Sequence, residues 1–333
     1  MKVLVMRLSS IGDVLLTTPV VRCLKKQVKG VELHYLTRGV NGELLKRNPY
    51  IDKLMVLGES IDNTIDALKR EGYDYVVDLH NNHRTRKIRL SLGVKNVVYR
   101  KENVRKFLFV LTKMDVMSGR SVVDRYMRSV EPLGVNNDDK GLEVFLPEEF
   151  ERDHLLEQTV DGIKLADLLN GPYVAIACGG QHATKRIPVE KIGELCSNLK
   201  TKAILLGDSG DNKRITDSKV SFAPNVTNLC GKTSLLMSAA IVQNASVVVT
   251  SDSSMLHFAS AFSRPVVVVW GATSPSFGFA AYRTESVNCE VKGLWCRPCS
   301  RMGSERCIRG NYACMHKQDW GKIADIVNSE TEK

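Results

Sequence analysis

Short apolar runs alternate with helical stretches along most of the 333-residue chain, and this alternation limits the folds open to it. In the first half, the apolar runs predict strands at residues 2–6, 32–36, 53–57, 74–79 and 96–99. Helices are predicted between them near 13–27, 40–47 and 61–70, followed by a longer helical region over about 103–133. Strand–helix alternation of this kind requires a mostly parallel sheet with helices on both faces.

The pattern restarts after Gly171-Pro172. Strands are predicted at 173–178, 203–206, 226–229, 246–250 and 265–270, with helices near 189–199, 210–219, 233–243, 253–262 and 317–328. We therefore predict two α/β domains, residues 1–165 and 166–333, with a last helix that can cross back to the first domain. Tandem α/β domains are expected to hold a ligand in the cleft between the carboxyl ends of their sheets.

The first predicted strand leads directly into Gly12-Asp13, followed by apolar residues at helical spacing. This places Asp13 where a strand gives way to a helix, the position at which open α/β folds bind their ligands. A carboxylate held there is a candidate general base. Thr17 and Thr18 follow in the first turns of the same helix, where they can shape the same side of the site.

Composition favours a cytoplasmic protein with anionic partners. The chain is 43% hydrophobic and 25% charged, as is ordinary for soluble proteins. It contains no apolar run near the ~20 residues that a membrane span needs, and its start lacks the pattern of a signal peptide. Its formal net charge of +10 favours binding to phosphorylated ligands, nucleic acid or an acidic membrane surface.

The positive charge is concentrated between residues 84 and 106, where nine Lys or Arg face a single acid, Glu102. One interpretation is a solvated basic face. The other is a surface for anionic lipid head groups or a phosphorylated acceptor, formed by Arg84, Arg86, Lys87, Arg89, Arg105 and Lys106. Nucleic acid is disfavoured, because no helix-turn-helix or zinc-finger pattern is present and only 6% of the residues are aromatic.

Five of the nine cysteines cluster between residues 289 and 314. Cys296 and Cys299 have the two-residue gap of a zinc knuckle, and Cys307 and Cys314 could complete four ligands. The spacing is irregular and lacks a second two-residue pair. Reduced thiols that pack a loop-rich segment are the favoured interpretation for a cytoplasmic protein, so we predict no metal, with structural zinc as the alternative.

The segment from Cys178 to Pro188 has the features of an anion site. Gly179 and Gly180 follow a strand and allow close approach of the backbone to a ligand. Lys185 and Arg186 supply positive charge before a helix that begins after the proline, and the amino end of a helix adds a partial positive charge. We predict a phosphate cradle here, of a kind distinct from a Walker loop.

A second segment, Val247 to His257, brings a polar cluster to the start of a helix. Asp252, Ser253 or Ser254 can cap that helix with its free amides directed at a ligand. His257 lies one turn further and can face the same ligand. Asp208, after the strand at 203–206, can reach a ribose or a base from the same edge.

These segments together resemble glycosyltransferase family 9, the lipopolysaccharide heptosyltransferases, over nearly the whole chain. The resemblance is carried by Arg7 with Gly12-Asp13-Val-Leu-Leu-Thr-Thr-Pro19, by Thr184-Lys185-Arg186-Ile187-Pro188, by Ser251-Asp252-Ser253-Ser254-Met-Leu-His257, and by Pro265–Gly271 with Thr273. It implies a GT-B fold, in which two Rossmann-like domains with parallel sheets face each other across a cleft. The acceptor would bind the first domain and the nucleotide-sugar donor the second.

The resemblance also implies an inverting, metal-independent transfer with no added cofactor, from ADP-heptose to a lipid-linked acceptor of the lipopolysaccharide core. Asp13 would be the general base, with Arg7, Gly12, Thr17 and Thr18 on the acceptor side. Thr184, Lys185, Ser253 and Ser254 would hold the donor phosphates, and Gly179, Gly180, Asp208, Asp252 and His257 would contact its nucleotide or sugar. The protein would act as a monomer, peripheral to the cytoplasmic face of the inner membrane.

Two residues depart from the family pattern: Ser254 stands in place of a glycine and Ile187 in place of a tryptophan. Both bear on which donor is used more than on the type of reaction. Two other functions stay open at this point. One is a sugar-nucleotide epimerase or hydrolase on the same fold, and the other is a basic protein with a degenerate site that binds membrane or nucleic acid.

Overall fold

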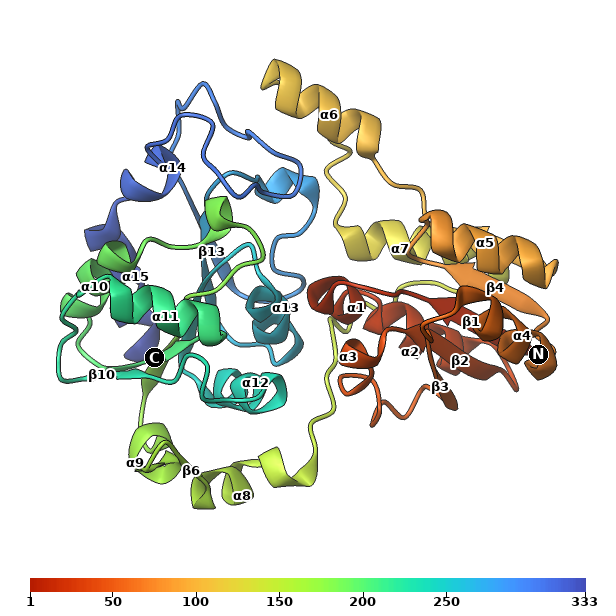
Figure 1. The fold of residues 1–333 in the computed structure, drawn as a ribbon, viewed down its shortest axis with the longest axis horizontal. Coiled ribbons are helices and arrows are strands. Elements are labelled where there is room, and N and C mark those ends of the chain that lie inside the picture. The colour runs from red at the N-terminus through yellow and green to blue at the C-terminus, as the bar shows by residue number, and fades with distance from the viewer. The chain divides into compact units, whose positions relative to one another are not determined.

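The computed structural model describes residues 1–333 and divides them into two compact units (Figure 1). The first unit comprises Met1–Asn103 and Arg120–Phe145, and the second comprises Val104–Gly119 and Leu146–Lys333. This division lies earlier than the predicted one at residues 165 and 166, and it assigns residues 104–119 to the second unit. The difference arises because the restart of the strand pattern marks the first strand of the second sheet, not the first residue that packs against it.

The first unit contains a five-stranded sheet in which every pairing is parallel, with the order β3-β2-β1-β4-β5. The central strand is β1, where Val5 pairs with Tyr35 of β2 on one side and with Val77 of β4 on the other. The strands are β1 Lys2–Met6, β2 Glu32–Thr37, β3 Lys53–Val56, β4 Tyr75–Asp78 and β5 Lys95–Val98.

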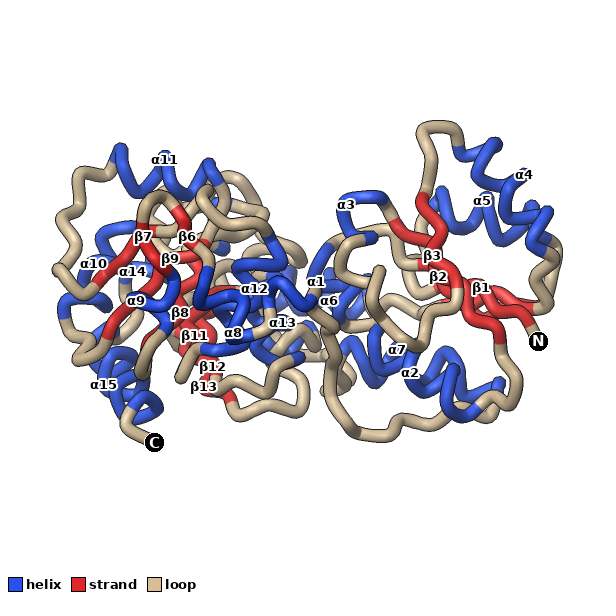
Figure 2. Tube along the Cα trace, turned by 90° about the horizontal axis from the view of Figure 1, so that it is seen from below, coloured by secondary structure: helices blue, strands red, loops and turns tan.

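Helices cover both faces of this sheet, as strand–helix alternation requires. Figure 2 shows α4 and α5 on one side of the strands and α2 and α7 on the other, in agreement with the pairing of α2 with α7 and of α4 with α5. The helices are α1 Ile11–Leu15, α2 Thr18–Gln27, α3 Gly39–Gly42, α4 Ile61–Glu71, α5 His83–Leu92 and α7 Val122–Val130, with a 3₁₀ turn, η1, at Glu131–Leu133.

Three helical predictions differ from the structure. The helix predicted at 13–27 is two helices, α1 and α2, the second of which has Pro19 in its first turn. The region predicted as one helix over 103–133 contains α6 Asn103–Thr112 and α7, which belong to different units. Helix α5 was not predicted, because four of its ten residues are Lys or Arg and only Ile88 and Thr85 are buried.

The second unit contains a six-stranded parallel sheet with the order β10-β9-β8-β11-β12-β13. Its strands are β8 Tyr173–Ala177, β9 Lys202–Leu206, β10 Val226–Asn228, β11 Val247–Ser251, β12 Val266–Trp270 and β13 Ser286–Glu290, and a hairpin of β6 Thr159–Val160 and β7 Ile163–Lys164 precedes them. The long helices are α10 Val189–Ser197, α11 Ser209–Asp217, α12 Leu235–Asn244, α13 Ser254–Ala261 and α15 Trp320–Thr331. The shorter elements are η2 Glu148–Phe150, α8 Arg152–Glu157, α9 Leu165–Leu169, η3 Ala183–Lys185, η4 Pro275–Phe277 and α14 Ala313–His316.

The last helix, α15, packs against α10 and against strands β8 and β11 of the second sheet. It therefore belongs to the second unit, in place of the crossing to the first domain predicted for it. Trp320, Ile323 and Val327 of α15 are buried in the core of this unit together with Ile187. Ile187 thus fills a core position in this chain and does not line a ligand site. None of the helices is long and apolar enough to span a bilayer.

Both sheets reverse their strand order beside their first strand. After β1 the chain adds β2 and β3 on one side and then returns to add β4 on the other, and β8, β9, β10 and β11 repeat this course. Such a reversal leaves the loops after the two central strands next to each other at the carboxyl edge, which is where open α/β sheets bind ligands. Each unit therefore has one favoured site, after β1 and β4 in the first and after β8 and β11 in the second.

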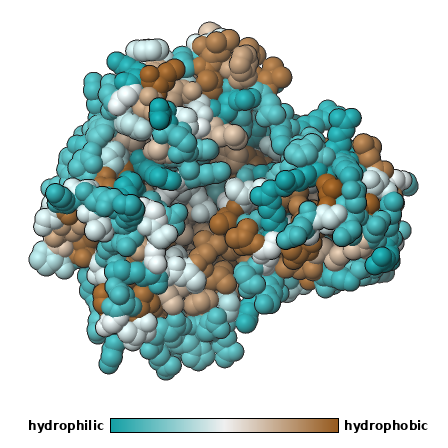
Figure 3. All heavy atoms as spheres, in the orientation of Figure 1, coloured by the Kyte–Doolittle hydropathy of each residue, from teal (hydrophilic) through white to brown (hydrophobic).

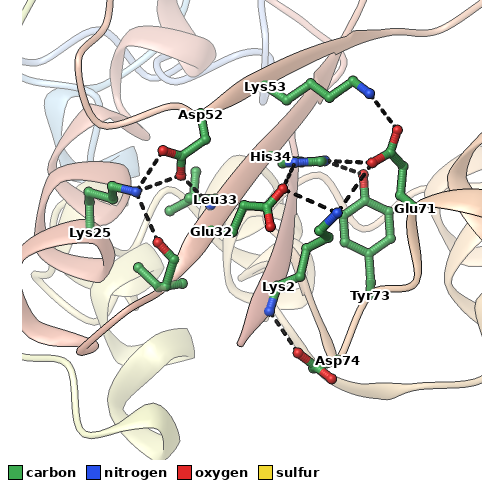
Figure 4. A network of polar contacts seen from close by, with 11 residues as sticks. Lys2, Lys25, Glu32, Leu33, His34, Asp52, Lys53, Glu71, Tyr73 and Asp74 are labelled. Carbon is green, nitrogen blue, oxygen red and sulfur yellow. Dashed lines mark hydrogen bonds and ion pairs between the residues drawn. The ribbon is translucent and has the colours of Figure 1, made fainter.

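A polar network lies at the opposite, amino-terminal edge of the first sheet (Figure 4). His34 lies 2.9 Å from both the Tyr73 hydroxyl and a Glu32 carboxylate oxygen, and Glu71 receives a hydrogen bond from Lys53 at 2.5 Å. Lys2, at the start of β1, also contacts Glu71. These residues lie at the starts of neighbouring strands, so we interpret the network as structural.

Arg22 of α2 holds the last segment of the first unit in place. Its buried guanidinium forms a bidentate pair with Asp138, at 2.8 and 2.6 Å, and contacts Glu143 at 3.0 Å. The hydrogen bond from Arg22 is the main cause that lowers the pKa of Asp138, to about 2. The ionised pair therefore fastens residues 138–143 to the helix layer.

Replacing Arg22 by methionine is expected to destabilise the protein by about 3 kcal/mol, because partners of a buried charge lose their compensation. Because the folded-state pKa of Asp138 is depressed, its contribution is complete above the ordinary pKa of a carboxyl, about 4, and is lost as the pH falls towards 2. Denaturant unfolding between pH 2.5 and 7 measures both effects. The neighbouring variant Asp139→Asn serves as the control, and equal pH dependence of the Arg22→Met variant and the wild type would contradict this role.

Candidate functional site

In the first unit, Asp13 lies on α1 in the loop region after β1. Ser10 caps the helix, and its backbone N–H and its hydroxyl donate to Asp13 Oδ2 at 3.2 and 2.9 Å. The other carboxylate oxygen, Oδ1, lies 2.7 Å from Nη2 of Arg7. The Asp13 side chain retains partial solvent exposure, so the structure fixes a reachable carboxylate at the favoured edge of the sheet.

Arg7 orients the Asp13 carboxylate. It is buried, and it donates to the backbone carbonyls of Ser9 and Leu79, both at 2.8 Å. Burial lowers the pKa of Arg7, but the charge of Asp13 and the neighbouring Tyr126 and Tyr35 outweigh burial and raise it above its ordinary value. Arg7 is thus a permanent cation that links the β1 loop to the end of β4, and its contacts make it a positioning residue.

Two residues near Asp13 were missed by the sequence analysis. His80 follows β4, and its Nδ1 accepts a hydrogen bond from the backbone N–H of Leu8 at 3.3 Å. Burial, Arg7 and Lys101 lower the pKa of His80 to about 3, so its ring is neutral at physiological pH. Burial and Arg7 also lower the pKa of Lys101, which follows β5. The signal that could have revealed both is their place after predicted strands on the same side of β1, since β4 neighbours β1 and β5 neighbours β4.

The other residues predicted on the acceptor side are inside the helix packing. Gly12, Thr17 and Thr18 are buried. The Thr17 hydroxyl lies 2.8 Å from the hydroxyl of Tyr35, and the Thr18 hydroxyl bonds the carbonyl of Leu15. Both hydroxyls thus already have partners within the unit, and a role of the two threonines on the acceptor side stays a prediction.

A shallow basic pocket of about 560 Å³ lies elsewhere at the same edge of the first sheet. Its lining comes from the residues after β2 and β3 and from the start of α5, and comprises Arg38, Leu57, Gly58, Glu59, Ile61, His83, Arg84 and Lys87. The positive side chains outnumber the one carboxylate, so the pocket suits an anionic group.

The basic residues predicted between 84 and 106 are divided between the two units. Arg84, Arg86, Lys87 and Arg89 lie on α5 of the first unit, whereas Arg105 and Lys106 lie on α6 of the second. Arg89 is directed towards Asp78, with Nε 3.8 Å from Oδ2, and donates to Asn96. Only Arg84 and Lys87 line the pocket.

In the second unit, the two predicted segments meet. Nζ of Lys185, in the loop after β8, lies 2.7 Å from Oδ2 of Asp252, which follows β11. Thr273, after β12, donates its hydroxyl to the same carboxylate oxygen at 2.8 Å. Both charged side chains are mostly shielded from solvent, which strengthens their attraction. Asp252 thus holds Lys185 in one position at the carboxyl edge of the sheet.

The start of α13 lies beside this ion pair. Ser253 caps the helix by accepting from the backbone N–H of Met255, and its hydroxyl is 2.9 Å from that of Thr250. Ser254 is the first helical residue, so the open amides of α13 lie next to Asp252. His257 is buried one turn further along.

One glycine of the predicted cradle, Gly179, is required by close approach, whereas a Cβ at Gly180 would make ordinary contacts. A Cβ at Gly179 would collide with the carboxylate of Asp211, which accepts from the backbone N–H of Asp208 at 3.1 Å. Asp208 caps α11 by accepting from the N–H of Asp211, so its carboxylate has a structural partner. Arg214, which the sequence analysis missed, donates to the carbonyls of Cys178 and Ile187 and fixes both ends of the loop.

Thr184 is buried and is held by Ser304, far along the chain. Its hydroxyl donates to the Ser304 carbonyl at 2.9 Å and accepts from the Ser304 N–H at 2.8 Å, and its own N–H donates to that carbonyl at 3.0 Å. These hydrogen bonds fix the loop that carries Lys185. Direct phosphate binding by Thr184 stays a prediction.

Ser304 belongs to the cysteine-rich segment, residues 289–316, which packs against the loops of the second site. Arg297 donates to the carbonyls of Gly271 and Thr273 at 2.6 and 2.8 Å, and Glu305 pairs with His182 at 2.8 Å. The segment therefore holds the loops after β8 and β12 in place. Its role was not predicted, because no local pattern reveals contacts so distant in sequence.

The cysteines of this segment are free thiols, as are the other cysteines. No group of three or more His, Cys, Asp or Glu side chains is arranged to hold a metal ion. The structure thus gives no support to a zinc site at Cys296, Cys299, Cys307 and Cys314. Burial raises the pKa of Cys314 to about 11, which keeps this thiol protonated at neutral pH.

The two edges offer complementary chemistry. The first unit presents an oriented carboxylate beside permanent positive charge, which suits proton abstraction from an approaching hydroxyl. The second presents a fixed lysine and open helix amides, which suit a phosphorylated group on which charge develops.

Comparison with known proteins places this chain in a family. The family model described as glycosyltransferase family 9 (heptosyltransferase) matches residues 62–308. Among curated proteins, the chain is 25% identical to lipopolysaccharide heptosyltransferase 1 of Campylobacter coli over 296 residues, which is 83% of this chain and 85% of that protein.

Solved structures show the same fold. A glycosyltransferase family 9 protein from Veillonella parvula superposes with a TM-score of 0.76 at 19% identity, covering 99% of this chain and 97% of that one. The ADP-heptose lipopolysaccharide heptosyltransferase II of Escherichia coli gives a TM-score of 0.71 at 17% identity, covering 100% and 99%. The predicted GT-B fold is thereby confirmed, and because the family model covers most of its length, this chain belongs to glycosyltransferase family 9 and is a glycosyltransferase.

Proposed function

We propose that this enzyme transfers heptose from ADP-heptose to a lipid-linked acceptor during assembly of the lipopolysaccharide core, with inversion at the anomeric carbon. The observation that carries the proposal is the Lys185–Asp252 pair beside the open end of α13 in a family 9 chain. The names of the relatives supply the sugar and its nucleotide. We place the donor on the second unit, the acceptor on the first, and a monomeric enzyme at the cytoplasmic face of the inner membrane.

The proposed donor site uses positively charged groups that the fold already holds in position. Lys185 and the amides of Ser253 and Ser254 would bind the diphosphate, and Asp252 and His257 would lie towards the sugar or nucleotide. Gly179 and Gly180 would allow the backbone to approach the ligand. Asp208 would contribute indirectly, by capping the start of α11. Charge develops on the leaving diphosphate, and a preorganised cation stabilises it without reorganisation. Because the chain itself supplies this charge, the proposed transfer uses no metal.

The proposed acceptor site is the first unit. Asp13 would take the proton of the acceptor hydroxyl while that oxygen attacks the anomeric carbon, and the bond from this carbon to the diphosphate oxygen would break to release ADP. A single displacement needs one carboxylate base, whereas a covalent route would need a second carboxylate as nucleophile. The basic pocket around Arg84 and Lys87 suits an anionic group of the acceptor.

Product analysis tests this function directly. With ADP-heptose and a core acceptor, mass spectrometry is expected to find the acceptor heavier by one heptose and ADP in equal amount. ADP or an isomerised sugar formed without acceptor would favour the hydrolase or epimerase alternative. A thermal-shift panel of ADP-, UDP-, GDP- and CMP-linked sugars checks the donor, because a ligand at 100 times its Kd stabilises the folded state by about 2.7 kcal/mol. A larger shift with a sugar linked to another nucleotide would contradict ADP-heptose.

A further inference from the structure

Helix α6 of the second unit carries an apolar stripe that faces solvent. Val104, Phe107, Leu108 and Leu111 recur at helical spacing and are all exposed, Phe107 by 54% and Leu111 by 65%. We call these four residues the α6 stripe. Figure 3 shows hydrophobic atoms gathered at the top edge of the view, over α6. In a surface helix of a soluble protein, the apolar residues are expected on the face that packs against the core.

The opposite face of α6 is already packed on its own unit. Phe109 is buried and meets the ring of Phe277 edge-on, with centroids 5.6 Å apart. Lys106 lies over the rings of Phe277 and Phe279, and Lys113 Nζ donates to the Pro298 carbonyl at 2.9 Å. The helix is thus held at both ends, and the α6 stripe is the side left facing outwards.

The contact with Pro298 joins α6 to the cysteine-rich segment, which exposes large apolar residues of its own. Trp295 is exposed by 70%, and Met302 and Ile308 are exposed to a similar extent. Arg309 lies over the Trp295 ring at 5.4 Å. Isolated exposed apolar residues are ordinary, but several large ones on two adjoining segments mark a surface that binds something apolar.

The same two segments also carry exposed positive charge. Arg105 on α6 and Arg301, Arg306 and Arg309 on the cysteine-rich segment are exposed. The exposed acid of that segment, Glu305, pairs with His182. Apolar side chains with basic neighbours and an exposed tryptophan match the interface of a bilayer with anionic head groups, where apolar burial and electrostatic attraction add.

We infer that the α6 stripe and the exposed residues of the cysteine-rich segment dock the second unit on an anionic phospholipid bilayer. The inference deepens the proposed function and rests on it for its purpose, since a lipid-linked acceptor would have to be met at a membrane. The predicted basic patch lies mostly on α5 but includes Arg105 and Lys106 of α6, and the inference assigns membrane binding to the apolar side of α6.

Co-sedimentation with vesicles tests the docking surface, using the full chain without donor or acceptor. We expect binding to vesicles of phosphatidylglycerol and phosphatidylcholine, weaker binding to phosphatidylcholine alone, and loss of binding in high salt. The double variant Phe107→Gln/Leu111→Gln is expected to reduce binding about tenfold or more, since it removes two apolar side chains from the contact. Both side chains are exposed, so the fold should survive, and an unchanged melting temperature checks this.

The matched control is Val56→Gln/Leu90→Gln, which removes two exposed apolar side chains from the first unit. It should bind vesicles like the wild type. Equal vesicle binding by both double variants would overturn the inference. So would a wild-type dimer, measured by light scattering, that becomes monomeric in Phe107→Gln/Leu111→Gln while vesicle binding stays intact. Turnover of a delipidated, water-soluble acceptor should be unchanged in this variant, which separates failure of docking from failure of the proposed transfer.

Discussion

Asp13→Asn is expected to lower the turnover number about a thousandfold while leaving the affinity for ADP-heptose unchanged. The amide cannot take the proton of the acceptor hydroxyl, and general base catalysis is typically worth factors of this size. The shape of the side chain and its ability to accept from Ser10 are retained, so the local fold should persist. Steady-state kinetics and calorimetric titration of the donor measure the two parts of this prediction.

The structure supplies a matched control for the structural role of Asp13. Asp124 occupies the same position at the start of α7, where the hydroxyl of Ser121 donates to it at 2.7 Å, as Ser10 does to Asp13. Asp124→Asn should cost about 1 kcal/mol of stability or less. Asp13→Asn should cost more, because it also leaves the buried Arg7 guanidinium without its anion. If the two variants also lost activity to the same extent, Asp13 would be a helix-capping residue only, and the base would have to be sought elsewhere.

Lys185→Met is expected to lower kcat/KM by about a hundredfold or more and to weaken the binding of ADP itself. The lysine would stabilise the charge that develops on the leaving diphosphate, and removal of one such group costs about 10²–10³ in rate. The substitution also leaves Asp252 without its cation, so that a carboxylate would lie close to the incoming phosphates. Rates and ADP affinity are measured at fixed ionic strength, because both depend on charge.

A second variant separates this electrostatic role from stability. In Lys185→Met/Asp252→Asn the unpaired carboxylate is gone, so the melting temperature should recover while turnover stays low. Lys232, which pairs with Asp161 at 2.7 Å on the same unit, provides the control variant Lys232→Met. Recovery of turnover in the double variant would show that Lys185 serves only to neutralise Asp252.

The positions of Asp13, Lys185 and Asp252 could be predicted because each follows an apolar strand. In parallel sheets the carboxyl ends of strands share one edge, so local patterns were enough to bring Lys185 and Asp252 together. For Thr17 and Thr18 the local pattern is less informative. Their place in the first turns of a helix says nothing about which side faces the sheet, and the structure buries both.

Other parts of the site depend on contacts that no local pattern encodes. The partner of Thr184 is 120 positions away, and Arg297 reaches Gly271 and Thr273 from a segment without regular structure. Helix α5 was not predicted because its charged residues interrupt the helical spacing of apolar residues. Asn82 and Thr85 nevertheless form a capping box that marks its start. This capping box is the local signal from which α5 could have been predicted.

The hydrogen bonds between Thr184 and Ser304 have a consequence for the order in which this protein is made and folds. Contacts between residues so far apart in sequence carry a large entropy of loop closure and form late. Strands β8, β9 and β11 are all synthesised before the cysteine-rich segment, so their sheet can form while the loop that carries Lys185 still lacks its anchor. A nascent chain would thus acquire its architecture before the loop proposed to bind phosphate becomes rigid, and we expect donor affinity to be among the last properties to appear.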